Sequence, residues 1–446
     1  MSGSVEQGCE SGGRAGTGVG AVAGAGAASS AGVAAVDPDR VARAGLSRCV
    51  EPEDHLGAVF AAVLDMRRWW ELIRGAGPGP DEVEALVTAA SLAGVPRAGT
   101  ALVAKGLERW RPRAREADPV ADLHHASAVG GGFLTPGDPA WPVGLDSLGP
   151  AAPFGLWWRG AGDLPRDWGT RPLLSVVGTR DPTAYGLAAT QQIVSALAAE
   201  GAGIVSGGAL GIDAAAHRSA LAAGSARPAT VAVLAGGIDR LYPSSNAQLL
   251  TQIAREQLLV TEHPPGCAPT RWRFLSRNRL IAALAPGTLV TEARWRSGSL
   301  STAHRAAELG RWVGAVPGPI AVATSDGCHR LVREGAAELI TRAEDVIEAL
   351  GWQQDAVLPG ADAWGEGGGG DGAAGDASAR QSDGLDDAEL RVWEALPVSR
   401  GVSLDRLLSV AGLGPSEALA ALQRLSHRGR VAQGAGGEWS RVRPRS

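Results

Sequence analysis

The residues of this chain best suited to bind a ligand lie between positions 267 and 305. Seven arginines and one acid, Glu292, give this segment a net charge of +6, although the whole chain of 446 residues has a net charge of −5. The arginines are Arg271, Arg273, Arg277, Arg279, Arg294, Arg296 and Arg305, with Trp272, Phe274 and Trp295 interleaved. Guanidinium groups bind phosphates and flat rings stack on unpaired bases. The segment therefore indicates binding of single-stranded nucleic acid, and the alternative is a solvated basic face over aromatic core residues.

Three glycine-rich turns follow short apolar runs and could seat a phosphate. A glycine lets a backbone approach a ligand closely, and the first N–H groups of a helix attract anions. The same residues could instead form plain strand–helix turns and helix N-caps. The turn residues that we predict at the binding site are Gly178, Thr179, Arg180, Gly207, Gly208, Ser297, Gly298 and Ser299.

Residue types that would indicate catalysis or metal binding are absent or scattered in the sequence. Lys105 is the single lysine and has no GxxxxGK[ST] loop around it. The eight histidines and four cysteines form no HExxH or CxxC spacing, and no GxSxG motif occurs. We interpret His217 and His304 as packing or surface residues, and Asp213 and Asp239 as caps or turn formers. The sequence therefore predicts no catalytic residue, no metal and no cofactor.

The elements that must position these residues alternate between strands and helices from residue 171 to about residue 351. Short apolar runs of this kind, separated by helices of 10–15 residues, are typical of a parallel sheet covered on both faces. We predict an α/β fold with a Rossmann-like doubly wound parallel sheet. The predicted strands are Leu173–Gly178, Gly203–Gly208, Thr230–Gly237, Leu258–Glu262, Thr288–Ala293 and Trp312–Gly318, and the predicted helices are Tyr185–Glu200, Ile212–Gly224 and Gly298–Gly310.

The composition changes on both sides of this central domain. Residues 1–45 are rich in Gly, Ala and Ser and are predicted to be a disordered tail. Residues 50–118 are predicted to be a small helical (SAM-like) domain, with helices at 58–73, 81–94 and 100–114, and 119–351 is the Rossmann-like domain with its lead-in. An acidic, Gly-rich linker is predicted at 352–387, and a winged-helix domain at 388–446. With no apolar run long enough for a signal peptide or a membrane span, we expect a cytoplasmic protein.

The order and spacing of seven motifs resemble the bacterial DNA-processing protein A family, also called Smf. They are VGTR (177–180), SGGALGIDAAAH (206–217), GGIDRLYPSSN (236–246), FLSRNRLIAAL (274–284), RSGSLSTA (296–303), GRWVGAVPG (310–318) and SDGCHRLVREGA (325–336). The resemblance implies a Rossmann-like protein that binds and protects incoming single-stranded DNA and loads the RecA recombinase in natural transformation. It also implies a homodimer formed through the Rossmann-like domain, with no established catalysis.

The same resemblance implies roles for individual residues. Arg180 would hold a phosphate, and Arg271 stands where the family often has a lysine that contacts DNA. Phe274 would lie beside the bases, and Arg277, Asn278 and Arg279 would line the same pocket.

Two other functions are compatible with the sequence. A nucleotide-processing enzyme of the phosphoribohydrolase type also has a glycine-rich turn, but there an acid follows early on the next helix. The first acid after Ser297–Ser299 is Glu308, over two helical turns away. A sequence-specific repressor would need base-reading side chains on the C-terminal module, and few are present. We therefore predict a binding protein rather than an enzyme.

Overall fold

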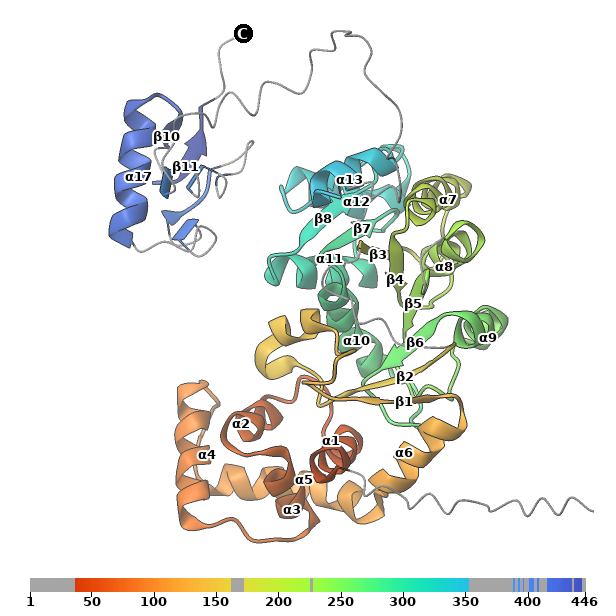
Figure 1. The fold of residues 1–446 in the computed structure, drawn as a ribbon, viewed down its shortest axis with the longest axis vertical. Helices are drawn as coiled ribbons and strands as arrows, with labels where there is room; N and C mark the ends of the chain where they lie inside the picture. The colour runs from red at the N-terminus through yellow and green to blue at the C-terminus, as the bar shows by residue number, and fades with distance from the viewer. Residues whose placement is uncertain are drawn as a thin grey trace, which may run out of the picture. The chain divides into compact units, whose positions relative to one another are not determined.

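The computed structural model describes residues 37–161, 172–224 and 228–352, together with α17 (Pro415–His427), β10 (Val431–Gln433), β11 (Trp439–Arg441) and a few other residues between 388 and 442 (Figure 1). The chain divides into two compact units, Met1–Asp355 and Ala356–Ser446. Most of the predicted tail and nearly all of the predicted linker lie outside the described residues.

The first unit is built on a nine-stranded sheet of order β1-β2-β6-β5-β4-β3-β7-β8-β9. From β6 to β9 all neighbouring strands are parallel, which confirms the predicted Rossmann-like sheet. At one edge, β2 pairs antiparallel with β6 and with β1, and neither edge strand was predicted. The strands are β1 Gly131–Leu134, β2 Leu156–Gly160, β3 Leu173–Val177, β4 Gly203–Ser206, β5 Thr230–Val233, β6 Leu258–Thr261, β7 Gly287–Val290, β8 Trp312–Ala315 and β9 Glu338–Leu339.

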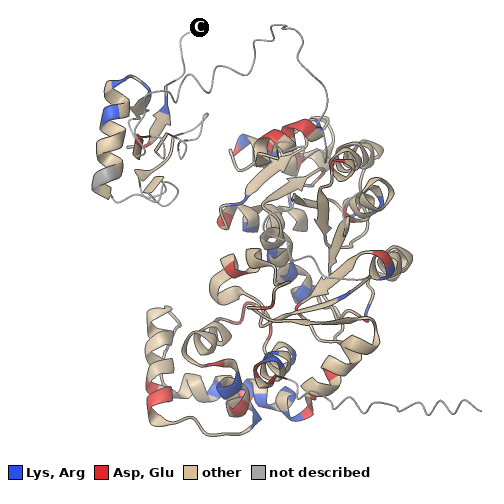
Figure 2. Ribbon diagram, in the orientation of Figure 1, with Lys and Arg blue, Asp and Glu red and all other residues tan. Residues whose placement is uncertain are grey.

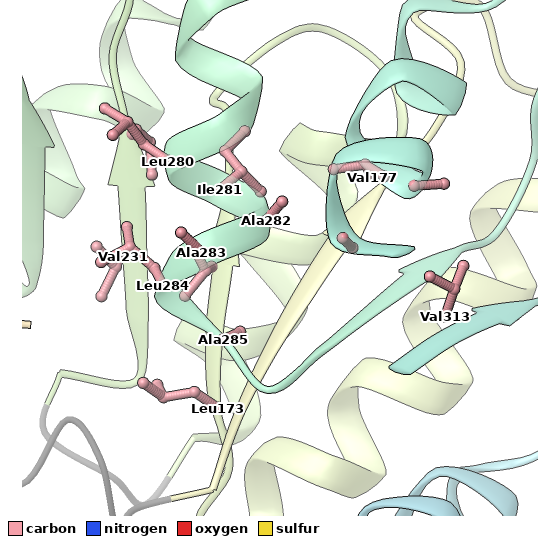
Figure 3. Packing of buried hydrophobic residues seen from close by; sticks show 14 of the residues in the cluster. Leu173, Val177, Val231, Leu280, Ile281, Ala282, Ala283, Leu284, Ala285 and Val313 are labelled. Carbon is pink, nitrogen blue, oxygen red and sulfur yellow. The ribbon is translucent and has the colours of Figure 1, made fainter. Parts of the chain in front are cut away.

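Helices cover both faces of this sheet, and alternate residues of the central strand β3 point to opposite faces. Leu173 and Val177 pack with α10 and α11 in one core, which Figure 3 shows around α10. Leu174 and Val176 pack with α7 and α8 in the other. The helices of this domain are α7 Ala184–Ala199, α8 Ile212–Ala223, α9 Ala247–Glu256, α10 Arg271–Leu284, α11 Gly298–Glu308, α12 Asp326–Arg333 and α13 Ala343–Leu350, with 3-10 turns at Val143–Ala151, Ser244–Asn246 and Ala323–Ser325.

Before the sheet lie six helices, of which α2 to α5 fall within the bounds 50–118 predicted for the helical domain. Together with α1 they pack around a core that includes the aromatic rings of Phe60, Trp69 and Trp110, whereas Ala126 of α6 packs with Phe133 and Trp157 of the sheet. The predicted single helix at 58–73 is two helices, because Asp65 accepts a hydrogen bond from the N–H of Arg68 and starts a new one. The helices are α1 Pro38–Cys49, α2 His55–Val63, α3 Met66–Arg74, α4 Pro80–Leu92, α5 Thr100–Glu116 and α6 Pro119–Ala128.

The prediction of a disordered tail as far as residue 45 is wrong for its last eight residues. Helix α1 begins at Pro38, and Asp37 caps it by accepting a hydrogen bond from the N–H of Asp39 at 3.1 Å. Proline is favoured in the first turn of a helix, where no intrahelical N–H bond is lost. The Asp37-Pro38 pair is a helix start that the small residues before it obscured.

In the second unit, helix α17 (Pro415–His427) is followed by an antiparallel hairpin of β10 (Val431–Gln433) and β11 (Trp439–Arg441). The buried carboxylate of Glu389 accepts hydrogen bonds from Arg424 and Arg428 of this unit at 2.9 and 3.0 Å. A hairpin after a helix agrees with the predicted wing. Much of the rest of 388–446 lies outside the described residues, so the winged-helix fold stays a prediction.

Among the residues that the structure describes, no helix is long and apolar enough to cross a membrane.

Candidate nucleic-acid interface

A pocket of about 230 Å³ opens at the carboxyl ends of the central strands. After β3 the chain adds β4, β5 and β6 on one side, and it later returns to add β7 and β8 on the other. Ligands of doubly wound sheets bind where the strand order reverses in this way. Eight predicted site residues line the pocket: Gly178, Arg180, Phe274, Arg277, Asn278, Ser297, Gly298 and Ser299.

Helix α10 supplies one wall of the pocket. Thr270 starts the helix by accepting a hydrogen bond from the N–H of Arg273 at 3.3 Å. Phe274, Arg277, Asn278 and Ile281 then face the pocket at the i, i+3, i+4, i+7 spacing of one helical face. Figure 2 shows basic residues along α10, in contrast to the acidic residues on α13.

Two guanidinium groups lie near the ring of Phe274. The Cζ atom of Arg180 is 5.4 Å from the ring centroid and that of Arg277 is 6.0 Å away. The ring of Tyr242 lies 5.7 Å from the same centroid. Arg180 is exposed, and the structure shows no ion pair for it with any described residue. A half-buried ring beside an uncommitted surface cation can stack on a base and bind its phosphate.

Arg277 is a buried cation beneath the pocket, with 4% of its surface exposed. Its Nη1 donates to the carbonyl of Val233 at 2.8 Å, while its Nε has no hydrogen-bond partner among the described residues. Burial lowers the pKa of Arg277 to about 10, even though the carboxylate of Asp213 opposes the change. The group is therefore charged at neutral pH, and the pocket floor favours an anion.

Asp213 also lines the pocket, although we interpreted it from the sequence as a turn former. Its carboxylate accepts hydrogen bonds from the N–H groups of Gly207 and Ala209 at 3.2 and 3.4 Å, which holds the turn after β4. Burial raises the pKa of Asp213, while Arg277 acts in the opposite direction. Asp213 therefore holds a turn, as we interpreted it, and also lines the pocket. Its position at the start of a helix, after the Gly207-Gly208 pair, is the sequence signal that could have placed it at the site.

Another wall of the pocket is the N-terminus of α11. The hydroxyl of Ser297 caps the helix by accepting from the N–H of Ser299, and the two hydroxyl oxygens are 2.7 Å apart. The side-chain amide of Asn278 donates to the carbonyl of Gly298 at 3.4 Å, which joins α10 to α11. Hydroxyls and the positive end of a helix dipole together suit a phosphate.

Four predicted residues lie close to the pocket without lining it. Thr179 is buried and links neighbouring loops through its backbone, since its N–H donates to the carbonyl of Glu292 and its carbonyl accepts from Ile212. Gly207 packs against the side chain of Arg277 and Gly208 against that of Leu250, so closely that a Cβ at either position would collide with its neighbour. Arg271 is exposed at the first position of α10. These residues shape or flank the pocket.

The prediction that Arg279 lines the same pocket is wrong. Its guanidinium forms a two-pronged ion pair with Glu262, at 2.7 and 2.6 Å, and only 2% of the residue is exposed. Positions 277 and 279 are two apart on one helix, so their side chains point in nearly opposite directions. Arg279 is committed to this buried pair and to hydrogen bonds with the carbonyls of Ala151 and Ser276.

Glu292, the one acid of the basic segment, does not line the pocket. It is buried, and it accepts hydrogen bonds from the hydroxyl of Thr324 and from the N–H of Thr183. Tyr242, which we did not predict as a site residue, comes from the motif at 236–246 that follows β5. An aromatic residue within that motif is the sequence signal that could have predicted Tyr242 as a site residue.

Within the described residues, no group of three or more His, Cys, Asp or Glu side chains is arranged to hold a metal ion. His217, on α8, is fully buried with its Nδ1 2.7 Å from the hydroxyl of Thr230 on β5. Burial, with the charge of Arg277, lowers the pKa of His217 to about 3. The ring is neutral and packed, as the sequence suggested.

The fold and the pocket define a Rossmann-like protein with a cationic, ring-bearing site at the switch point of its sheet. A family model described as DNA recombination-mediator protein A matches residues 132–351. A Mycobacterium tuberculosis chain, provisionally named DNA processing protein DprA, is 39% identical over 400 residues, which cover 84% of this chain and 94% of that one.

Two solved structures extend the comparison. DNA processing protein A from Streptococcus pneumoniae is 30% identical, with a TM-score of 0.52, and the match covers 70% of this chain and 98% of that one. A structure of the Helicobacter pylori protein, described for its single-stranded DNA binding mode, is 31% identical with a TM-score of 0.44 and covers 49% and 95% of the two chains. This chain belongs to the DNA processing protein A family.

Proposed function

We propose that this protein binds single-stranded DNA in the pocket formed by the turn after β3 and the first turns of α10 and α11. The observation that carries this proposal is the cluster in which Arg180 and Arg277 flank the ring of Phe274. Family membership supports a role in DNA processing and recombination.

The geometry favours an unpaired strand over a duplex. The ring of Phe274 is half-buried in a small pocket, so a base must leave its stack to reach it. Stacking on a ring does not distinguish strongly among bases, and phosphates carry no sequence information. Binding should therefore show little sequence preference and a strong dependence on salt.

We further propose that the protein protects incoming single strands and loads a RecA recombinase onto them in natural transformation or DNA recombination. In this proposal it acts in the cytoplasm as a homodimer formed through the Rossmann-like domain. These roles rest on the family to which the chain belongs.

The test is a mobility-shift comparison of oligo-dT with duplex DNA over a salt series, for the wild type and two charge reversals. Arg180→Glu removes the exposed pocket cation, while Arg255→Glu makes the same change in the last turn of α9, which runs back to the amino end of β6. Losing one charged contact should weaken binding by roughly 10- to 150-fold, because such a bond contributes about 1.5–3 kcal/mol.

The salt series adds a second readout. The association constant of the wild type should fall with rising salt, and in Arg180→Glu the plot of log K against log salt should be shallower by about 0.7, the value for one phosphate contact on a single strand. Arg255→Glu should match the wild type. Equal losses in both variants would indicate a diffuse charge effect and would refute the pocket as the binding site.

A phosphoribohydrolase activity is the alternative that the fold allows. The carboxylate in the pocket wall, Asp213, is buried and holds its own turn through two N–H groups. The helix α11 has no acid near its start. Base release from purine monophosphates would overturn the proposal of a binding protein.

A further inference from the structure

Two tryptophan rings near the pocket are about half exposed. Trp295 is 46% exposed and lies in the loop between β7 and α11, two residues before the pocket residue Ser297. Trp272 is 55% exposed and lies in the first turn of α10, two residues before Phe274. Either ring could extend the binding surface beyond the pocket, and their surroundings differ.

The ring of Trp295 is held from one side. The Cζ atom of Arg330, on α12, lies 5.0 Å from the ring centroid. Arg330 is itself held by Glu334, one turn further along, at 3.3 Å, and its Nη1 donates to the carbonyl of Trp295 at 3.5 Å. A cation over one face of an indole fixes the ring and leaves part of its surface open to solvent.

The charges around Trp295 favour a polyanion. Arg294 and Arg296 flank it in the sequence and both are exposed. Arg296 shows no ion pair with any described residue, and Arg294 forms an exposed pair with Asp181 at 3.5 Å, of the kind that contributes little. The loop therefore presents a ring and two accessible guanidinium groups beside the N-terminus of α11.

The surroundings of Trp272 are less favourable for DNA. This ring lines a groove whose wall includes Glu51, Glu53 and Asp54. Although arginines also lie in that wall, they are paired with these acids: Arg113 with Glu51, and Arg109 with Asp54. A phosphate there would have to compete with carboxylates.

We infer that Trp295 is a second stacking platform for the bound strand, which leaves the pocket past Ser297 and continues over this ring. The inference rests on the proposed binding of single-stranded DNA and adds the direction in which the strand leaves the pocket. Because Trp295 and Ser297 are two residues apart, the platform lies within about 7 Å of the pocket wall along the backbone. A base beyond the one at Phe274 would therefore stack there, and only strands long enough to reach it would gain affinity.

The test measures fluorescence anisotropy of labelled oligo-dT of increasing length with the full chain and its Trp295→Ala, Trp295→Phe and Trp272→Ala variants. Trp295→Ala should weaken binding of long strands by roughly 5- to 150-fold, the range for one stacked base. The shortest strand that the wild type binds should be unaffected. Trp295→Phe should recover most of the loss, and Trp272→Ala should match the wild type at all lengths.

Three results would overturn the inference. Equal weakening of Trp295→Ala for short and long strands would mean that the residue supports the pocket and binds no base. Wild-type affinity of that variant at every length would mean that the strand does not reach it. The same length-dependent loss in Trp272→Ala would mean that the strand does not pass over Trp295 in preference to Trp272. Failure of the proposed function itself gives a different result, because the wild type would then bind no oligo-dT or Arg180→Glu would bind it unchanged.

Discussion

Replacing Gly207 by alanine tests whether Arg277 is fixed beneath the pocket. A Cβ at this position would lie 1.9 Å from Nη1 and 2.6 Å from Cζ of Arg277. The guanidinium would have to move and give up its 2.8 Å hydrogen bond to the carbonyl of Val233. A hydrogen bond from a charged group contributes about 1.5–3 kcal/mol, so Gly207→Ala should lower the free energy of unfolding by about that amount. It should also weaken binding of oligo-dT, because the displaced cation would enter the pocket space.

Gly298→Ala is the matched control for the stability of this variant. Nothing lies within 4 Å of a Cβ at Gly298, and the residue is the first of α11, where alanine is a better helix former than glycine. Urea unfolding should therefore show this variant to be as stable as the wild type or slightly more so. If Gly207→Ala is as stable to urea as Gly298→Ala and binds oligo-dT like the wild type, Arg277 is not confined beneath the pocket and the reasoning is refuted.

Three further predictions concern the rest of the chain. Glu262→Ala leaves Arg279 buried without its partner, and urea unfolding should show a loss of about 3–5 kcal/mol; a loss well below 1 kcal/mol would contradict this. The pKa of His217 is about 3 in the folded state and about 6.5 in the unfolded chain. Between these two pH values the imidazole therefore takes up a proton only when the protein unfolds. Stability should thus fall as pH drops from about 6.5 toward 3, more steeply in the wild type than in His217→Gln; parallel urea midpoints across pH would rule this out. Removing residues 353–446 should leave oligo-dT binding largely unchanged, because the pocket and its core precede that segment; lost binding in a mobility shift would place the site elsewhere.

The sheet could be predicted from the sequence because its strands are short apolar runs that end in glycine or polar residues. β3 and β6 agree with the predicted bounds to within one residue. The edge strands β1 and β2 were missed, since GGFL and LWWRG are rich in glycine and tryptophan and show no alternation. An antiparallel edge on a parallel sheet depends on partners that are far away in the chain.

Helix α10 was not predicted either, for a different physical reason. Helices were recognised by an apolar stripe along one face, and every residue from Ser276 to Leu284 is buried. A helix that is enclosed on all sides has no such stripe, and the arginines of α10 interrupt its apolar residues so that the segment does not show helical periodicity. The same enclosure explains the error at Arg279, because the residue types did not reveal which side of the helix faces the pocket.

The enclosure of α10 has a consequence for how the protein tolerates mutation. A surface helix accepts changes at every third or fourth position, where its side chains meet only water. In α10 one side is occupied by the pocket residues, another by the buried pair of Arg279 and Glu262, and a third by the sheet. A saturation library over residues 276–284 should therefore show no permissive periodicity, with intolerance continuing from one residue to the next through two and a half turns.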